Sequence, residues 1–274
     1  MAAPSAVITG AASGIGLALS TRLARNGYRV MMSDIRADAL HDARATVEAA
    51  APGAAVVDVV ADVTDAASVE ALAAAAVEEF GGIDLAINNA GVIGPVGPVW
   101  EGPLEQWQLA LGINFWGVLH GMRAFLPRMI AAGGGRLVNI ASVASWSSGP
   151  QMGSYGAAKH AVLALTESAY RELAELGSPV RLSVVCPTTV RTSLVSHLEG
   201  DASEQGSIGR TRLLAARERG LDPAAVAETV VAGIEADQYL ITTDPEWVLN
   251  AARQRVAIAE GAEPPLDREP PRRA

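Results

Sequence analysis

Three residues near the middle of the chain, Ser142, Tyr155 and Lys159, have types and spacing that suit proton transfer at a carbinol or carbonyl oxygen. Tyr155 and Lys159 are four residues apart, so on a helix they share one face. A free tyrosine has a pKa near ~10, and an ammonium group one turn away favours its phenolate form. We expect this pair to lower the tyrosine pKa by roughly two to three units, which corresponds to about 3–4 kcal/mol. The Ser142 hydroxyl would hold the substrate oxygen while another group takes or gives hydride.

A tyrosine and a lysine at this spacing are common, so their meaning depends on the elements around them. The apolar run 136–141 reads as a buried strand that places Ser142 at its carboxyl end. A loop over 143–150 with Pro and Gly separates this strand from a helix over 151–176. Other strands are expected at 5–9, 28–34, 55–61, 84–88, 180–186 and 239–243, and other helices at 17–26, 37–50, 66–80, 104–132, 222–236 and 246–260. This alternation predicts an α/β fold with a doubly wound parallel sheet covered on both faces.

A glycine-rich turn follows the first of these strands. Gly10, Gly14 and Gly16 stand between the strand at 5–9 and the helix at 17–26, which is the context that a dinucleotide site requires. Glycines let the backbone approach a pyrophosphate, and a helix amino terminus favours its negative charge. A glycine-rich turn without a ligand is the alternative.

Asp34 ends the second strand, where a carboxylate can accept hydrogen bonds from the adenosine ribose hydroxyls and would repel a 2′-phosphate. Ser13, rather than Arg or Lys, precedes Gly14, and Ile35 follows Asp34. Both features favour NAD over NADP. Arg36 is a weak counter-signal that we interpret as a solvated turn residue. A role for Asp34 as a helix cap is the alternative.

Polar residues also follow the later strands. Asp62 could receive the adenine amino group or act as a cap, and Asp65 is the expected N-cap of the helix at 66–80. Asn88 is expected to tie neighbouring strands together through its amide. Asn114 lies inside the helix expected at 104–132, where Asn is a mediocre helix former. It could hold a buried water or a local kink, or it could be an ordinary satisfied amide.

The composition limits the function classes. The chain has 274 residues, half of them apolar, and a formal net charge of −9 with a pI near 5.0, which argues against nucleic acid and an anionic membrane surface as partners. The single cysteine, Cys186, excludes an intramolecular disulfide and is expected to be a small buried hydrophobe. The four histidines show no ligand spacing, so we expect no metal. With no bilayer-spanning run and no signal peptide, we expect a cytoplasmic protein.

The chain is expected to form one domain over 1–260. The stretch 193–221 is polar and ambiguous in structure, and we expect a substrate lid around 188–220. The tail over 261–274 is rich in Pro, Glu and Arg and is expected to be disordered.

Together these motifs resemble those of the short-chain dehydrogenase/reductase family, in its single-domain branch. The match covers about residues 5–245, and the matching segments, in order and spacing, are 9–16, Asp62, 88–91, Asn114, Ser142 and 155–159. The resemblance implies a Rossmann-like sheet of about seven strands. One departure is Pro187-Thr188, where the family usually has Pro-Gly. A side chain there could narrow the nicotinamide side of the pocket or reshape the lid.

The resemblance also implies roles for individual residues. Tyr155 would be the acid/base, Ser142 would orient the substrate oxygen, and Lys159 would lower the tyrosine pKa and bind the nicotinamide ribose. Asn114 would hold a water in a proton relay, and Val190 and Thr192 would contact the nicotinamide amide. The implied NAD-binding residues are Gly10, Ser13, Gly14, Ile15, Gly16, Asp34, Ile35, Asp62, Val63, Asn89, Ala90, Gly91, Tyr155, Lys159, Pro187, Val190 and Thr192.

We therefore expect an NAD-dependent dehydrogenase that transfers a hydride between NAD(H) and an uncharged, bulky secondary alcohol or ketone. The substrate pocket should be lined by 92–97, 143–152 and the lid, with Val92, Val143, Trp146, Met152 and Leu194 available. The alternatives are an NADPH-preferring carbonyl or ketoacyl-type reductase and a catalytically idle dinucleotide-binding protein. The apolar breadth of the helices at 104–132 and 151–176 predicts pairing across a two-fold axis, as a homodimer or, as the family implies, a homotetramer.

Overall fold

The computed structural model describes residues 3–195 and 204–265 of the chain. Among these residues, seven parallel strands form one sheet in the order β3-β2-β1-β4-β5-β6-β7. The doubly wound α/β fold is therefore confirmed. The strands are β1 (Ser5–Thr9), β2 (Arg29–Asp34), β3 (Val56–Val60), β4 (Leu85–Asn88), β5 (Arg136–Ile140), β6 (Arg181–Cys186) and β7 (Leu240–Thr242).

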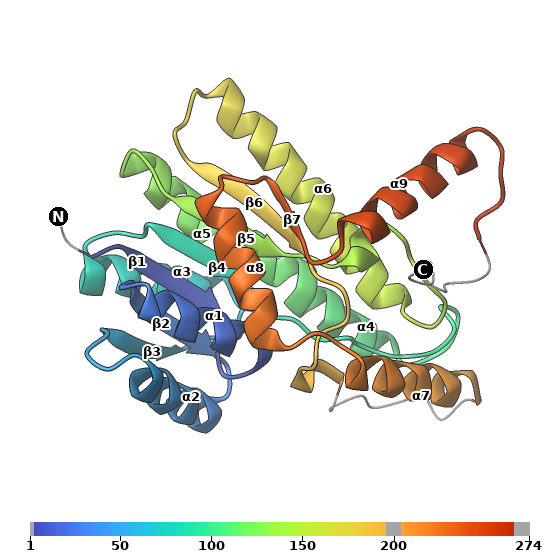
Figure 1. The fold of residues 1–274 in the computed structure, drawn as a ribbon, viewed down its shortest axis with the longest axis horizontal. Helices are drawn as coiled ribbons and strands as arrows, with labels where there is room; N and C mark the ends of the chain where they lie inside the picture. Colours follow the sequence, from blue (N-terminus) through green and yellow to red (C-terminus); the bar gives the residue numbers. More distant parts are fainter. Residues whose placement is uncertain (1–2, 196–203, 266–274) are drawn as a thin grey trace.

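The helices cover both faces of this sheet (Figure 1). Their bounds are α1 (Gly14–Arg25), α2 (Ala37–Ala50), α3 (Ala66–Phe80), α4 (Leu104–Leu111), a π-helical turn η1 (Gly112–Trp116), α5 (Gly117–Ala131), a 3₁₀ turn η2 (Val143–Ser145), α6 (Gly153–Glu175), a 3₁₀ turn η3 (Ser193–Val195), α7 (Glu204–Glu218), α8 (Pro223–Glu235) and α9 (Pro245–Ala259).

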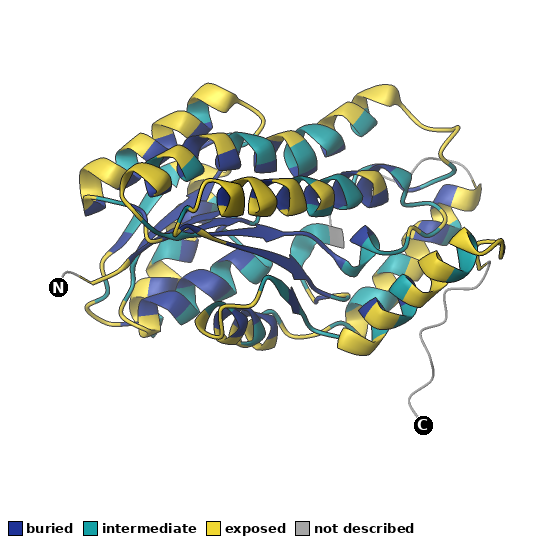
Figure 2. Ribbon diagram, turned by 90° about the horizontal axis from the view of Figure 1, so that it is seen from above, coloured by how far each residue is buried: buried dark blue, intermediate teal, exposed yellow. Residues whose placement is uncertain are grey.

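Two hydrophobic cores lie on the two sides of the sheet. Helices α1, α2 and α8 pack on one face, around Leu19, Leu40 and Val230, and helices α3, α5 and α6 pack on the other, around Leu72 and Phe125. Because parallel strands are buried on both faces, they read as nearly continuous apolar runs, as in β1 and β4. Figure 2 shows the buried sheet between two helical layers whose outer surfaces are exposed.

The strand order reverses between β1 and β4. The chain winds from β1 through β2 to β3 in one direction and from β4 to β7 in the other. In open α/β sheets, ligands bind outside the carboxyl ends of the strands at such a switch point. The loops that follow β1, β4, β5 and β6 are therefore the expected location of a ligand site.

The structure differs from the sequence prediction in two places that matter for the cleft. The helix predicted over 104–132 is interrupted by the π-helical turn η1. Part of the ambiguous stretch 193–221 forms the helix α7. The predicted cap Asp65 is confirmed, since its side chain accepts a hydrogen bond from the backbone N–H of Ala67 in the first turn of α3, and Asp222 caps α8 in the same way.

The stretch Leu104–Ala131 is long enough and, by mean hydropathy, apolar enough to cross a membrane, although charged residues such as Arg123 and Arg128 interrupt it. In the structure its second half, α5, packs against the sheet and against α3, where Met122, Phe125 and Met129 belong to the hydrophobic core. This stretch is therefore a core helix of the α/β fold.

Candidate active site

A large cleft runs along the carboxyl ends of the strands, with a volume of about 2800 Å³. This exceeds the roughly 300–1,000 Å³ of an ordinary small-molecule pocket, so the cleft has room for a dinucleotide and a substrate together. All of the site residues expected from the sequence line it except Gly16. The five side chains expected to form the substrate pocket also line it, namely Val92, Val143, Trp146, Met152 and Leu194.

The glycine-rich turn between β1 and α1 is closely packed. Gly10 has φ of +65°, and a Cβ there would stand 2.7 Å from the Cα of Ala90. A Cβ on Gly16 would stand 2.3 Å from the carbonyl oxygen of Gly10, so Gly16 allows the turn to fold on itself. The amide of Asn89 donates to the carbonyls of Thr9 (2.8 Å) and Gly10 (3.1 Å) and ties the turn to the end of β4. The turn thus presents bare backbone and the amino terminus of α1 to the cleft.

Asp34 ends β2 beside this turn, buried at 8% exposure. Its Oδ2 accepts from the backbone N–H of Ala12 at 3.2 Å, and its Oδ1 accepts from the N–H of Arg36 at 3.1 Å. The helix that follows has Arg36 at its N-cap position, so the alternative that Asp34 caps the helix is wrong. The carboxylate therefore lines the cleft beside the glycine-rich turn.

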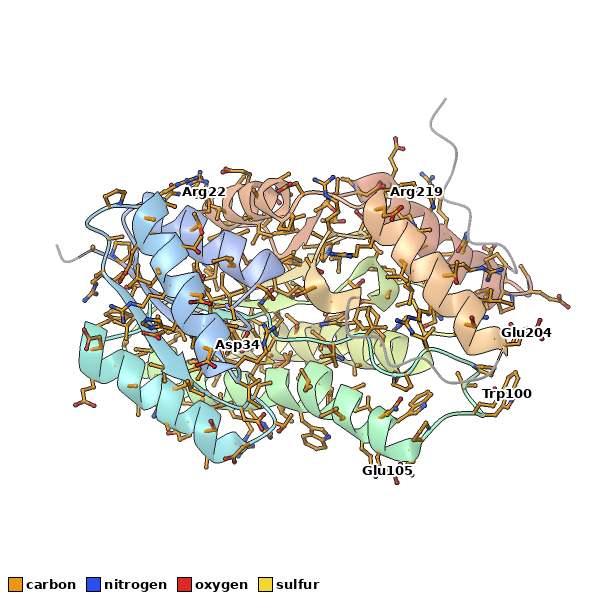
Figure 3. All side chains as sticks on the ribbon, turned by 90° about the horizontal axis from the view of Figure 1, so that it is seen from below. Arg22, Asp34, Trp100, Glu105, Glu204 and Arg219 are labelled. Atoms are coloured by element: carbon orange, nitrogen blue, oxygen red, sulfur yellow. The ribbon has the colours of Figure 1, made fainter. Side chains whose placement is uncertain are left out.

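Arg36 is exposed between β2 and α2, as the sequence suggested, but it also forms an ion pair. Its guanidinium pairs with Asp34, with Nε 3.1 Å from Oδ1 and Nη2 3.3 Å from Oδ2. Nη2 also lies 3.4 Å from Oγ of Ser13 in the glycine-rich turn. A cation therefore lies beside the carboxylate that was expected to exclude a 2′-phosphate. Figure 3 labels Asp34, which lies beside the start of α2.

Two further polar residues lie where the sequence placed them. Oδ1 of Asp62 accepts from both the backbone N–H and the hydroxyl of Thr64, each at 2.8 Å, so Asp62 stabilises the turn before α3 while it lines the cleft. Asn88 donates from Nδ2 to Oδ1 of Asn139 on β5 at 2.9 Å. The prediction that Asn88 ties neighbouring strands together is confirmed.

Ser142, Tyr155 and Lys159 converge at the middle of the cleft, and all three are buried. Ser142 follows β5, and its Oγ accepts from the backbone N–H of Ala144 at 3.1 Å. Tyr155 and Lys159 project from the first two turns of α6. The ammonium nitrogen of Lys159 donates to the carbonyl of Ile140 at 2.9 Å and lies 5.7 Å from the centre of the Tyr155 ring.

The electrostatics of this group differ from the sequence expectation. Burial raises the pKa of Tyr155 above its ordinary value of 10.0, while hydrogen bonding with Ser142 acts in the opposite direction. Burial also lowers the pKa of Lys159 from 10.5 to about 8. The expected lowering of the tyrosine pKa is therefore wrong, because desolvation of the phenol dominates and the lysine is itself desolvated. Tyr155 is a buried phenol that carries its proton at neutral pH.

Asn114 lies in the π-helical turn η1 and is completely buried. Its Oδ1 accepts from the N–H of Val92 at 3.1 Å, and its Nδ2 donates to the carbonyls of Val92 (2.7 Å) and Ala110 (2.9 Å). The side-chain amide is therefore fully hydrogen-bonded, and it lies in the π-helical turn that interrupts the helix. The sequence had left open both a satisfied amide and a local kink. It fixes the loop after β4 against α4.

Cys186 and Thr188 flank Pro187 at the end of β6. Cys186 is buried, and burial raises the pKa of its thiol to about 11, so its prediction as a small buried residue is confirmed. The N–H of Thr188 donates to Oγ1 of Thr243 at 3.0 Å, and the two hydroxyls lie 3.1 Å apart. The unusual threonine thus connects the loop after β6 to the loop that leads into α9.

Helix α9 contributes cleft-lining residues that the sequence did not indicate, including Trp247, Gln254 and Arg255. Arg212 and Leu213 of α7, and Arg219 just after it, line the cleft from within the segment 188–220 that was expected to do so. Figure 3 marks α7 by Glu204 and Arg219 near its two ends. The polar, glycine-containing sequence of α7 gave no periodic apolar signal. A helix was predicted at 246–260, close to the observed α9, but no motif indicated that it faces the cleft.

No metal site accompanies this arrangement in the described part of the chain. Within residues 3–195 and 204–265, no group of three or more His, Cys, Asp or Glu side chains is placed to hold a metal ion. The chemistry that these side chains can perform is proton transfer at an oxygen held between Ser142 and Tyr155.

Comparison with known proteins points to one family. The family model described as short chain dehydrogenase matches residues 4–202. The 1-deoxy-11-beta-hydroxypentalenate dehydrogenase of Streptomyces avermitilis is 43% identical over 244 residues, covering 88% of this chain and 85% of that protein. The cyclohexanol dehydrogenase of an Acinetobacter strain is 33% identical over 248 residues, covering 90% of this chain and 93% of that protein.

A solved structure supports the same relationship. A short chain dehydrogenase/reductase from Burkholderia phymatum, crystallised in complex with NAD, superposes with a TM-score of 0.90 and 35% sequence identity. The superposition covers 96% of this chain and 96% of that one.

Proposed function

Because the chain belongs to the short-chain dehydrogenase/reductase family, we propose that it is an NAD-dependent dehydrogenase of a bulky secondary alcohol that also reduces the corresponding ketone. The observation that carries this proposal is the convergence of buried Ser142, Tyr155 and Lys159 in one cleft with the glycine-rich turn and Asp34. Relatives from two bacterial genera are named as dehydrogenases of alcohols, a hydroxypentalenate and cyclohexanol, in agreement with this reaction type.

The residues at the first half of the cleft fit a dinucleotide. Gly10 and Gly14 have positive φ and leave the backbone uncovered at the amino terminus of α1, where a pyrophosphate would bind. Asp34 offers carboxylate oxygens to ribose hydroxyls, and Asp62 lies beside the expected adenine position. When bound, NAD would supply the hydride acceptor at C4 of its nicotinamide ring. We assign the adjacent side of the cleft to the nicotinamide, next to Pro187, Val190 and Thr192.

The remaining steps belong to the chain's own side chains. In reduction, the Tyr155 hydroxyl donates its proton to the carbonyl oxygen as the carbon receives hydride, and Ser142 holds that oxygen by a hydrogen bond. In oxidation, the Tyr155 phenolate takes the carbinol proton. Because burial raises the pKa of Tyr155, we expect alkaline pH to favour the oxidative direction more than the reductive one.

Lys159 and Asn114 complete the proposed catalytic set. Lys159 lines the cleft one turn from Tyr155 and would bind the nicotinamide ribose through its Nζ. Asn114 would hold a water in a proton relay, through an amide that is already fixed by Val92 and Ala110.

The substrate half of the cleft is lined mainly by apolar side chains. Val92, Val143, Trp146, Met152 and Leu194 all face it. This lining supports an uncharged, bulky substrate such as an alicyclic or aromatic secondary alcohol. We infer that the segment 188–220 acts as the lid of this half, which is supported by the position of α7 beside the cleft; residues 196–203 of this segment lie outside the described residues.

A preference for NADPH is the second candidate, favoured by one observation. Arg36 pairs with Asp34 and reaches Ser13, where it could neutralise part of the repulsion between the carboxylate and a 2′-phosphate. We favour NAD because Asp34 is buried against the glycine-rich turn and keeps both oxygens directed to backbone N–H groups.

We also propose a homodimer or homotetramer that forms through α4–α5 and α6. Large apolar side chains are exposed on these helices, including Leu109, Trp116 and Tyr170, and a second copy would cover them. A molar mass equal to that of one chain, measured by light scattering at micromolar concentration, would contradict this proposal. The enzyme is proposed to act in the cytoplasm, as one domain over 1–260; the tail predicted to be disordered lies largely outside the described residues.

The experiment that tests the function is a substrate screen that follows NADH absorbance. Purified protein is mixed with NAD or NADP and a panel of cyclic, aromatic and short-chain alcohols, and with the matching ketones and NADH or NADPH. We expect turnover of bulky secondary alcohols with NAD. Binding of NADH without turnover of any member would indicate an idle dinucleotide-binding protein, and turnover restricted to small hydroxy acids would contradict the proposed substrate class.

A further inference from the structure

The last helix, α9, presents one face to the substrate half of the cleft. Trp247, Asn250, Ala251, Gln254, Arg255 and Ile258 all line the cleft. Their spacing of three and four residues places them along one side of the helix. Of the residues of α9, Val248 and Ala251 are buried, while Leu249 and Val256 are more than half exposed. Figure 1 shows α9 extending from the body of the molecule beyond β7. The apolar packing of α9 therefore rests on few fully buried side chains, Val248 and Ala251.

Arg255 adds a polar connection to that packing. Its Nε donates to the carbonyl oxygen of Trp146 at 3.3 Å, and its Nη2 lies 2.8 Å from Nε2 of His160. A guanidinium has donors and no acceptor, so Nε2 of His160 must accept. The ring proton then lies on Nδ1, which faces the carbonyl of Gly156 at 2.8 Å. Both bonds are therefore compatible with one tautomer of the histidine.

The two partners of Arg255 belong to the catalytic elements. Trp146 ends the short turn that begins at Ser142, and its side chain lines the cleft. His160 follows Lys159 on α6. One guanidinium thus joins α9 to the serine segment and to the helix that carries Tyr155. At the other end of α9, the loop before it is held by Thr188 through Thr243.

We propose that α9 is the wall that selects the substrate and that Arg255 is the positioning residue that holds this wall against the catalytic elements. The inference rests on the proposed function, because it concerns the substrate half of the same cleft. Arg255 would act on substrate binding through the placement of α9, and the cofactor half would be unaffected. Loss of its bonds should weaken substrate binding while the chemical step and NADH binding are preserved.

The test uses Arg255→Ala with Arg255→Lys and Arg253→Ala as companions. Arg253 lies on the same helix and carries the same charge, but its guanidinium contacts Asn250 of its own helix and does not line the cleft. Kinetics are measured with cyclohexanol and with the larger decahydro-2-naphthol. In Arg255→Ala we expect KM for cyclohexanol to rise about tenfold, roughly the effect of one charged hydrogen bond. We expect kcat and the dissociation constant of NADH to stay within about twofold, and the selectivity between the two alcohols to change.

Arg255→Lys should recover part of the KM, because an ammonium keeps the charge but cannot span both acceptors as a planar fork does. Arg253→Ala should match the wild type. A KM that is unchanged in Arg255→Ala, an equal rise in Arg253→Ala, or a fall in kcat alone would overturn the proposal.

Hydrogen exchange provides a reading that does not depend on turnover. Amides of 143–150 and 245–259 should exchange faster in Arg255→Ala than in Arg253→Ala, since the connection between these segments is lost. Equal exchange in the two variants would overturn the inference even if no alcohol is turned over. Absence of turnover by the wild type would instead contradict the proposed function, so the two failures are distinguishable.

Discussion

Lys159 is the only lysine in the 274 residues, which allows its charge to be measured without interference. The side chain is buried at 3% exposure, and its pKa falls from 10.5 to about 8. The physical cause is desolvation, which disfavours the ammonium form. Selective labelling with ¹³C-lysine should give one side-chain signal, and we expect it to titrate with a midpoint near 8.

The same shift predicts a pH-dependent stability. Between pH 8 and 10.5 the unfolded chain binds more protons at this site than the folded protein, so the free energy of unfolding rises with pH in that window. A pKa of about 8 in place of 10.5 corresponds to about 3 kcal/mol in total. About 2 kcal/mol of this should be recovered between pH 7 and pH 9.5.

Lys159→Met isolates this effect. The variant also loses the hydrogen bond to Ile140, but that loss hardly depends on pH. Chemical denaturation gives the free energy of unfolding of each protein. The value for the variant minus the value for the wild type should be about 2 kcal/mol larger at pH 7 than at pH 9.5. A constant difference across this range, or a titration midpoint near 10.5, would refute the reasoning that burial alone sets the charge of Lys159.

Three further predictions follow from named contacts. Gly121→Ala should destabilise the protein by about 2–3 kcal/mol in chemical denaturation, because its Cβ would stand 2.0 Å from Oδ1 of Asn88, whereas Gly134→Ala, with no atom within 4 Å, should have little effect; equal effects would contradict the packing argument. Asp34→Ser should raise kcat/KM for NADP relative to NAD by about tenfold or more, and unchanged selectivity would count against Asp34 as the discriminating residue. Because the pKa of Tyr155 is raised, kcat/KM for alcohol oxidation should increase with pH beyond 9 while ketone reduction does not, and an oxidation profile that is flat from pH 7 to 10 would argue against a buried neutral phenol.

The elements and strand ends could be predicted because their signals are local. Continuous apolar runs between Gly and Pro breakers identify strands that are buried on both faces, and parallel strands bring their carboxyl ends to one edge. Ser142, Asp34 and Asn88 therefore lie where the sequence placed them. The role of Asn88 also followed from its place at a strand end, where an unpaired amide needs a partner.

The pKa of Tyr155 could not be predicted because it depends on burial. The spacing of Tyr155 and Lys159 places them on one face of α6, but it does not say how far each is removed from water or where the ammonium hydrogen bonds go. In the structure the Nζ of Lys159 donates to Ile140, and desolvation dominates for both groups.

The ion pair of Arg36, the helical structure of α7 and the place of α9 beside the cleft could not be predicted, for a different reason. The ion pair of Arg36 with Asp34 depends on the backbone conformation between β2 and α2, which residue type does not determine. Helix α7 buries Gly206 and Gly209 and has no apolar stripe for a periodic pattern to reveal. The position of α9 depends on Arg255 and its contacts with residues about a hundred positions earlier in the chain.

The central claim is that Tyr155 transfers the proton while hydride moves to or from the nicotinamide. The most direct test is the turnover of cyclohexanol by Tyr155→Phe, with NADH binding measured by fluorescence on the same preparation. The account predicts a loss of kcat of about 10²–10⁴-fold with NADH binding preserved. Turnover close to that of the wild type would contradict it.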